Sequence, residues 1–245
     1  MRIDYRGHAC VKLTSRTGEE LLIDPFEPEG FDGRMRYGPI EDRPDYVATT
    51  HEHADHAAID SVPGRPEILP SDPEVSAGAF RIRRAEFDHD EYDGRRFGGS
   101  VDALVVEVDE TTVVHGADIG QSPPPSVDPM LRHPDVFLVP VGGLYTIGAG
   151  QAVEWCVRLA PRCVVPIHYK TDRCDLPIDG PETFLQFVAS KQSGPADGGP
   201  DVEPRETRRS SLDLNGSLDG TIRAEGFGFE VAPLTPSVHR RASLR

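Results

Sequence analysis

Several short apolar segments of this chain stop at a residue that can bind a metal ion, and this pattern constrains the fold more than any other feature. The segments 20–23, 46–50, 111–114 and 163–167 lead to Asp24, His51, Asp118 and His168, respectively. Their aliphatic and β-branched composition predicts strands. In layered α/β folds the ends of strands gather along one edge, where ligands bind. We therefore expect these four side chains, far apart in sequence, to converge in space.

The remaining segments predict further strands and two helices. Strands are expected at 11–13, 101–108, 136–141 and 221–231, and helical spacing occurs at 152–159 and 182–189. This mixture predicts α/β layers rather than an all-β fold. We expect a single domain over residues 1–232, with a mobile polar loop at 193–211 and a frayed tail at 233–245.

Composition argues against several classes of protein. Of the 245 residues, 37% are hydrophobic and 27% are charged, which is the balance of a globular protein. No segment approaches the ~18 apolar residues of a membrane span, and the N-terminus lacks the apolar core of a signal peptide, so we expect a cytoplasmic protein. A net charge of −15 argues against nucleic acid as a partner. The four cysteines include no C-x-x-C pair, which argues against a zinc knuckle.

The segment 51–56, with the sequence HEHADH, concentrates three histidines and an aspartate directly after a predicted strand. His51 and His53 alternate along an extended backbone and therefore point to the same side. Asp55 and His56 follow where the chain must turn, so they face a second point. Imidazole and carboxylate ligands suit Zn²⁺, Mn²⁺ or Fe²⁺, and a catalytic zinc needs about three protein ligands. The segment alone supplies two ligands for each of two metals, and it differs from the H-E-x-x-H zincin pattern.

This H-x-H-x-D-H motif resembles the signature of the metallo-β-lactamase superfamily. Further phrases are similar to one branch of it, the UPF0173 and ascorbate-6-phosphate-lactonase-like metal-dependent hydrolases. These phrases are Gly7-His8-Ala9-Cys10, Leu22-Ile23-Asp24-Pro25, Thr50-His51, Val139-Pro140-Val141-Gly142-Gly143 and Pro166-Ile167-His168-Tyr169. The resemblance covers about residues 1–170 and implies an α+β fold, the four-layer αββα sandwich.

The resemblance also implies a set of seven metal ligands. The first metal would be held by His51, His53 and His89, the second by Asp55, His56 and His168, and Asp118 would bridge them. Asp118 lies in a segment that departs from the family pattern, because Ala117 stands where the family usually has glycine. We expect Asp55 and His168 to take part directly in catalysis.

Other polar residues are expected to play supporting roles. We expect His8 and His115 to support the site or the structure rather than to bind metal, and Asp24 to orient a ligand histidine. His133 and His239 are expected to be ordinary surface residues.

The sequence offers four candidates for the residue that donates a proton to the leaving group. Tyr145, Thr146, Tyr169 and Lys170 all follow predicted strand ends. The arginines at 81, 83 and 84 precede His89, and we expect them to form a solvated strand face rather than a phosphate site.

These observations predict a dinuclear metal-dependent hydrolase. Two divalent ions, Zn in the first place and Mn or Fe as alternatives, would share a hydroxide that attacks a small ester, lactone or phosphodiester. Their charge favours an anionic small-molecule substrate. An RNA-processing nuclease of the superfamily fits poorly with the net charge of −15. A diiron redox protein normally replaces one histidine of the motif. A metal- or partner-binding protein without turnover is the remaining alternative, and the sequence leaves a homo-oligomer open.

Overall fold

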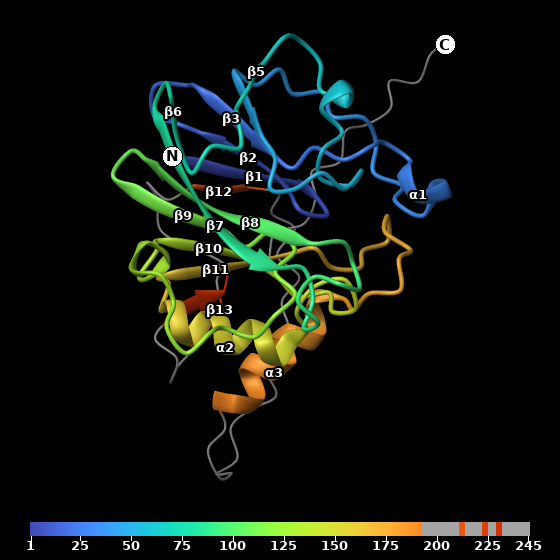
Figure 1. The fold of residues 1–245 in the computed structure, drawn as a ribbon, viewed down its shortest axis with the longest axis vertical. Helices are drawn as coiled ribbons and strands as arrows, with labels where there is room; N and C mark the ends of the chain where they lie inside the picture. Colours follow the sequence, from blue (N-terminus) through green and yellow to red (C-terminus); the bar gives the residue numbers. More distant parts are fainter. Residues whose placement is uncertain (193–210, 214–221, 225–228, 232–245) are drawn as a thin grey trace.

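The computed structural model describes residues 1–192, 211–213, 222–224 and 229–231, which form two β-sheets packed face to face (Figure 1). The first sheet has six strands, in the spatial order β12 (Ser211–Asp213), β1 (Arg2–Gly7), β2 (Cys10–Thr14), β3 (Glu20–Ile23), β4 (Tyr46–Ala48) and β5 (Glu67–Ile68). The second has eight, in the order β13 (Ile222–Ala224), β14 (Phe229–Val231), β11 (Cys163–Ile167), β10 (Val136–Pro140), β9 (Thr111–His115), β8 (Ser100–Val108), β7 (Phe80–Asp88) and β6 (Glu74–Ala77).

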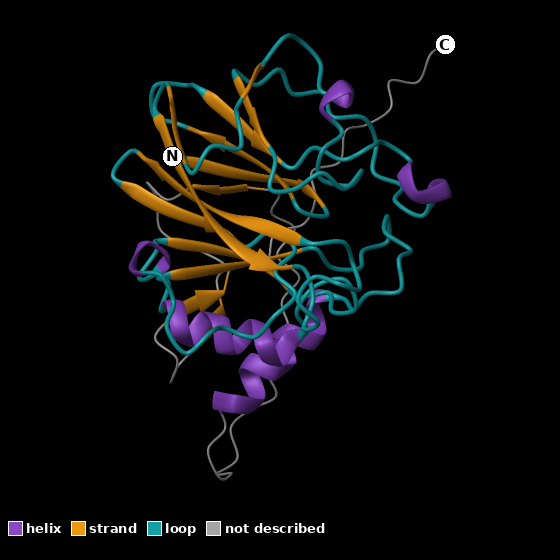
Figure 2. Ribbon diagram, viewed as in Figure 1, coloured by secondary structure: helices purple, strands orange, loops and turns teal. Residues whose placement is uncertain are grey.

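Helices cover the outer face of the eight-stranded sheet. The two long ones are α2 (Ala149–Leu159) and α3 (Pro181–Gln192), which lie side by side beneath that sheet in Figure 2. The helix α2 turns an apolar face inward, and its Trp155 is fully buried while the indole N–H donates to the carbonyl of Gln121 at 2.8 Å. Short helical turns occur at α1 (Gly30–Gly33), η1 (Ile59–Ser61) and η2 (Pro129–Leu131).

The strand β3 of the six-stranded sheet is apolar on both faces. Leu21 and Ile23 of β3 point into the main core between the sheets, whereas Leu22 belongs to a second buried cluster on the other side. Loop residues such as Phe26 and Tyr37 complete this second cluster. This alternation follows from the two-residue period of a strand. A loop with short helical turns therefore forms the outer layer over this sheet, opposite the helical layer of α2 and α3.

The αββα architecture predicted from the sequence is confirmed, and one element is wrong. Instead of a single strand over 221–231, the chain forms β13 and β14, which pair antiparallel with Ile222 opposite Val231. The predicted mobile loop at 193–211 lies outside the described residues except for Ser211, which begins β12. The predicted tail at 233–245 also lies outside them, and the single domain over 1–232 stays a prediction.

Strand direction brings the predicted metal ligands to one edge. In the first sheet β1 and β3 both pair antiparallel with β2 and so run the same way, and β4 is parallel to β3. In the second sheet β7 and β9 both pair antiparallel with β8, while β10 and β11 run parallel to β9. Long loops leave this edge of the sandwich, on the right in Figure 2. Within the described residues, no helix is both long enough and apolar enough to cross a membrane.

Candidate metal centre

The residues of the site follow the carboxyl ends of six strands. The residues that follow them are His8 after β1, Asp24 after β3, the segment 51–56 after β4, His89 after β7, Asp118 after β9 and His168 after β11. All of these except Asp24 contribute ligand atoms to three overlapping groups, each with all atoms within 4.8 Å of one another. The convergence predicted from the strand ends is therefore observed.

The first group contains His51, His53 and His89. The Nε2 atom of His51 lies 3.1 Å from Nδ1 of His53, and the His89 ring lies 5.2 Å and 5.0 Å from their ring centres. His89 is buried, whereas the other two rings are partly exposed. The expected first metal set is thus assembled, with its accessible side at the 51–56 segment.

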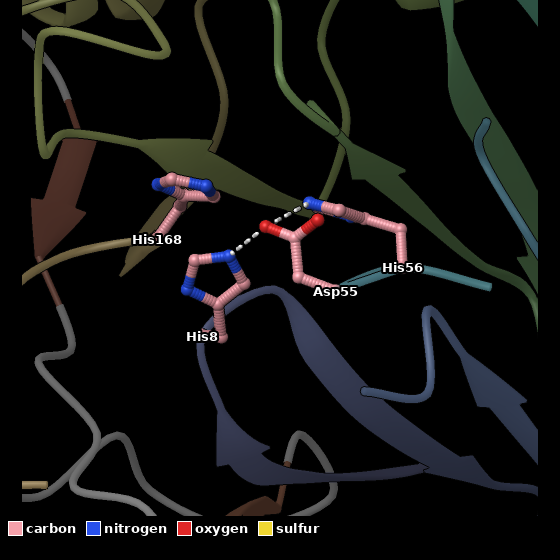
Figure 3. A group of neighbouring side chains, drawn as sticks. All are labelled: His8, Asp55, His56 and His168. Carbon is pink, nitrogen blue, oxygen red and sulfur yellow. Dashed lines mark hydrogen bonds and ion pairs between the residues drawn. The ribbon is translucent and has the colours of Figure 1, made fainter. Parts of the chain in front are cut away.

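The second group contains the expected Asp55, His56 and His168, together with His8 (Figure 3). His8 Nε2 lies 2.8 Å from Asp55 Oδ2, and His56 Nε2 lies 3.6 Å from the same oxygen. The rings of His8 and His168 are 3.9 Å apart. His8 and both other histidines are buried, so the Asp55 carboxylate is enclosed by imidazoles.

Asp118 lies between the two groups. Its Oδ2 atom is 3.5 Å from Nε2 of His89 in the first group. The same oxygen is 3.2 Å from Nε2 of His56 and 3.3 Å from Nε2 of His168 in the second. A carboxylate so placed can bind ions on both sides.

Two buried hydrogen-bond networks orient the ligands. Asp24 accepts from the backbone N–H and the hydroxyl of Thr50 at 2.8 Å each, and lies 2.9 Å from Nδ1 of His56. This contact leaves Nε2 of His56 facing the site, as expected for a carboxylate that orients a ligand. His115 Nδ1 accepts from the backbone of Ala117, so its Nε2 donates to the Ala9 carbonyl and the ring is committed to structure.

The backbone at the site requires glycine at two positions and holds three other residues at positive φ. A Cβ atom on Gly120 would lie 2.1 Å from the carbonyl oxygen of His89, and one on Gly142 would lie 2.3 Å from that of His168. His8, Asp24 and His168 all have φ between +50° and +55°, which is unfavourable for residues other than glycine. Such conformations concentrate at functional sites.

Charges inside the cluster set the protonation of its histidines. Burial opposes protonation of His56, but the carboxylates of Asp118, Asp55 and Asp24 raise its pKa well above the usual value. Burial also acts against ionisation of Asp118, yet His168 and His56 hold its pKa well below the ordinary range. Without a bound metal ion, the ring of His56 is therefore stabilised in its protonated, positively charged form.

Two other histidines are held neutral. Burial, aided by His168, lowers the pKa of His8 to about 4. Burial and the proximity of His56 lower the pKa of His51 to about 3. A neutral imidazole is the form that binds metal.

The donor set fits divalent ions. Among the described residues, several buried polar atoms of the site have no hydrogen-bond partner, although such atoms are normally paired. They are Nδ1 of His8, Nε2 of His56, both ring nitrogens of His89, Oδ1 of Asp118 and Nδ1 of His168. Imidazole and carboxylate ligands around a partly open cluster are the chemistry of a Zn, Mn or Fe site.

The other residues singled out in the sequence lie in different surroundings. Lys170 lies 3.5 Å from Asp175, and the Thr146 hydroxyl donates to a backbone carbonyl. Tyr169 is buried against Tyr5. Arg81 of β7 is exposed and pairs with Glu74, as expected for a solvated strand face. Arg83 pairs with Glu107, whereas the side chain of Arg84 is largely buried, pairs with Asp102 and donates to the Thr49 carbonyl, so the expectation is wrong for Arg84. His133 is exposed, and His239 lies outside the described residues.

His8 was expected to support the site or the structure, and its ring lies within the second group, 2.8 Å from Asp55. The signal that could have found it is the strand-end pattern itself, since His8 directly follows β1. The strand β1 is not among those predicted from the sequence, so this position was not recognised as a strand end.

Comparisons with known proteins identify the family of this chain. Residues 2–168 match the family model of the beta-lactamase superfamily domain. A UPF0173 metal-dependent hydrolase of Methanospirillum hungatei is 33% identical over 194 residues, covering 70% of this chain and 84% of that protein. One from Methanoregula boonei is 30% identical over 193 residues, covering 70% and 83%. A crystal structure of a Thermotoga maritima protein of the metallo-β-lactamase superfamily covers 95% of this chain and 97% of its own, with TM-score 0.66 and 24% identity.

Proposed function

This chain belongs to the UPF0173 metal-dependent hydrolases of the β-lactamase superfamily, and from that premise we propose that it uses two divalent ions to hydrolyse a small ester, lactone or phosphodiester. The position of Asp118 carries the proposal. One carboxylate oxygen within 3.5 Å of histidines from both groups suits a bridge between two ions. We infer His51, His53 and His89 as ligands of one ion, and Asp55, His56 and His168 as ligands of the other.

The bound ions would lower the pKa of water and polarise the scissile carbonyl or phosphoryl group. The chain contributes charge and orientation. Four positive charges from two divalent ions face two negative ones from Asp55 and Asp118, so the site keeps a positive charge that favours an anionic transition state. His8 fixes one oxygen of Asp55 at 2.8 Å, which holds the carboxylate in a single orientation.

Tyr145 is the best-placed donor of a proton to the leaving group. Its ring packs edge-on against Phe97, whose own ring lies 6.0 Å from His89. In the described part of the chain its hydroxyl has no hydrogen-bond partner, whereas Thr146 and Lys170 are engaged elsewhere. A partly exposed phenol at this position can reach a substrate bound at the first metal group.

Elemental analysis of protein purified without a metal-affinity tag tests the proposal. About two Zn, Mn or Fe ions per chain, together with turnover of a generic ester or phosphodiester, would support it. One ion per chain would contradict the dinuclear assignment and question His89 or Asp118. No ion after reloading with Zn and Mn would favour a binding protein without turnover.

A further inference from the structure

We propose that the loop 90–99, through Arg96, binds an anionic group of the substrate beside the metal centre. The inference rests on the proposed function and narrows its substrate class. The substrate would be an ester or lactone that carries a carboxylate or phosphate group away from the bond that is cleaved.

The loop is held rigidly by one carboxylate. Asp90 is buried, and its Oδ1 accepts from the backbone N–H groups of Tyr92 and Gly94 at 2.6 Å and 3.1 Å. Its Oδ2 accepts from those of Arg96 and Phe97 at 2.7 Å and 3.0 Å. A loop with four backbone donors on one side chain presents the side chains of its tip in a fixed position.

The loop directly follows His89 and borders the first metal group. The Phe97 ring lies 6.0 Å from the His89 ring and 5.5 Å from that of Tyr145. A Cβ atom on Gly98 would come within 3.4 Å of Nε2 of His53. His53 is partly exposed, so the loop stands at the accessible side of the site.

Arg96 is a cation without an ionic partner at this rim. Its guanidinium carbon lies 4.9 Å from the centre of the Phe97 ring, and the side chain is exposed. Among the described residues no acidic or carbonyl group pairs with it. Its neighbour Arg95 differs, because it donates to Asp93 at 2.6 Å and to the Tyr92 carbonyl at 2.8 Å.

The chemistry of this arrangement matches an oxyanion. A guanidinium stacked on an aromatic ring keeps its planar face of donors available for carboxylate or phosphate, which it binds with two parallel hydrogen bonds. The Phe97 ring contacts both sides, since it lies 4.9 Å from the Arg96 guanidinium carbon and 6.0 Å from the His89 ring.

Two matched variants and two matched esters test the inference. We would measure kcat/KM of the metal-loaded enzyme for mono-4-nitrophenyl glutarate and for its methyl ester, in wild type, Arg96→Gln and Arg95→Gln. We expect Arg96→Gln to lower kcat/KM about tenfold or more for the charged ester and to leave the neutral one within about twofold. Arg95→Gln should change neither. Equal loss for both esters, or no loss for either, would overturn the inference.

A binding experiment separates this inference from the proposed function. Titration calorimetry would give the Kd of glutarate and of methyl phosphate for the metal-loaded wild type and Arg96→Gln proteins, whose metal contents are measured in parallel. Weaker binding by about tenfold in the variant supports the anion site even where no ester is cleaved, and the anion with the larger loss identifies the group recognised. Unchanged Kd values for both anions overturn the inference and leave the hydrolase proposal intact. Failure to turn over both these esters and a generic phosphodiester contradicts the hydrolase proposal alone.

Discussion

His8 joins two parts of the candidate metal centre that come from different sheets. Its Nε2 lies 2.8 Å from Asp55 Oδ2, and its carbonyl oxygen accepts a hydrogen bond from the backbone N–H of His168 at 2.7 Å. The same carbonyl accepts from the Tyr5 hydroxyl at 2.8 Å. The side chain of His8 thus positions one expected ligand while its backbone positions another.

Replacing His8 should therefore weaken the second metal site. We expect His8→Ala to reduce the affinity for the second ion about 10–100-fold, because Asp55 loses the donor that orients it. His8→Gln keeps an N–H donor at a similar reach and should recover much of the affinity. Metal titration with elemental analysis measures both variants.

The control for this change is the exposed His133, whose replacement by alanine should leave metal binding as in wild type. If His8→Ala binds two ions with wild-type affinity, the positioning role is wrong. If His8→Gln is as weak as His8→Ala, the ring is needed as a ligand rather than as a donor.

Asp24 should affect metal binding without approaching the ions. Its carboxylate accepts from Thr50 and holds Nδ1 of His56 at 2.9 Å. We expect Asp24→Asn to lower metal affinity about 10–100-fold, since the amide offers a poorer partner to the imidazole. The exposed Asp60 provides a matched control, because Asp60→Asn lies near the motif but outside this network. Equal affinity in the two variants would argue against the role.

Strand ends and the segment 51–56 pointed to a metal site from the residues alone, whereas His89 and the division of the ligands between two metals came from the family resemblance. The predicted strand at 163–167 coincides with β11, and the helix predicted at 152–159 lies within α2. Because parallel strands end at one edge, Asp24 and His168 could be placed together without coordinates. The αββα layers themselves came from the family resemblance and not from the pattern of apolar residues.

The features that could not be predicted from the sequence depend on contacts between distant segments. The first strand, β1, alternates polar residues such as Asp4 and Arg6 with Ile3 and Tyr5, and both polar positions are engaged in ion pairs. Such a strand carries a weak apolar signal, so His8 was not recognised as a strand end. Close backbone approach, as at Gly120, depends on the loop that lies opposite and leaves no local pattern.

Gly120 offers a direct test of that close approach. An alanine Cβ there would lie 2.1 Å from the His89 carbonyl, so the loop that carries His89 must move. We expect Gly120→Ala to lower the free energy of unfolding by about 1–3 kcal/mol and to weaken the first metal site. Gly38→Ala is the control, because a Cβ atom there meets open space. Urea unfolding and metal content of the two variants give the answer, and identical results would refute the clash.

His53 is partly exposed, so its replacement should affect activity without affecting the fold. We expect His53→Ala to keep the fold and to lower activity by more than about 100-fold. A loss of up to that size is typical of a residue that only supports a ligand. Asp55→Ala should behave in the same way. Circular dichroism checks the fold, and turnover of a generic phosphodiester checks the activity. Near-native turnover in either variant would show that the proposed mechanism is wrong.

Acid should destabilise the metal-free protein while Asp55 and Asp118, whose pKa values are lowered, are still ionised. Burial holds the pKa of His8 at about 4 and that of His51 at about 3, whereas in the unfolded chain both lie near 6.5. Below pH ~6.5 the unfolded state therefore binds more protons, so stability falls as the pH decreases from ~6.5 toward ~4. His56 has a raised pKa, so its contribution is complete by pH ~6.5 and does not change in this window. The lowered pKa of Asp118 affects stability only below ~3.8.

The free energy of unfolding of chelator-treated protein, measured by urea between pH 7.5 and 4.5, checks this prediction. His8 alone would account for roughly 3 kcal/mol at ~1.4 kcal/mol per pH unit, and His8→Gln should flatten the profile while His133→Ala leaves it unchanged. In the metal-loaded enzyme the same protonation competes with the ions, so activity should fall below about pH 6 as metal is released. A profile that stays flat to pH 5 in both experiments would mean that these imidazoles are not held neutral by burial, and that the cluster is more open to water than its packing indicates.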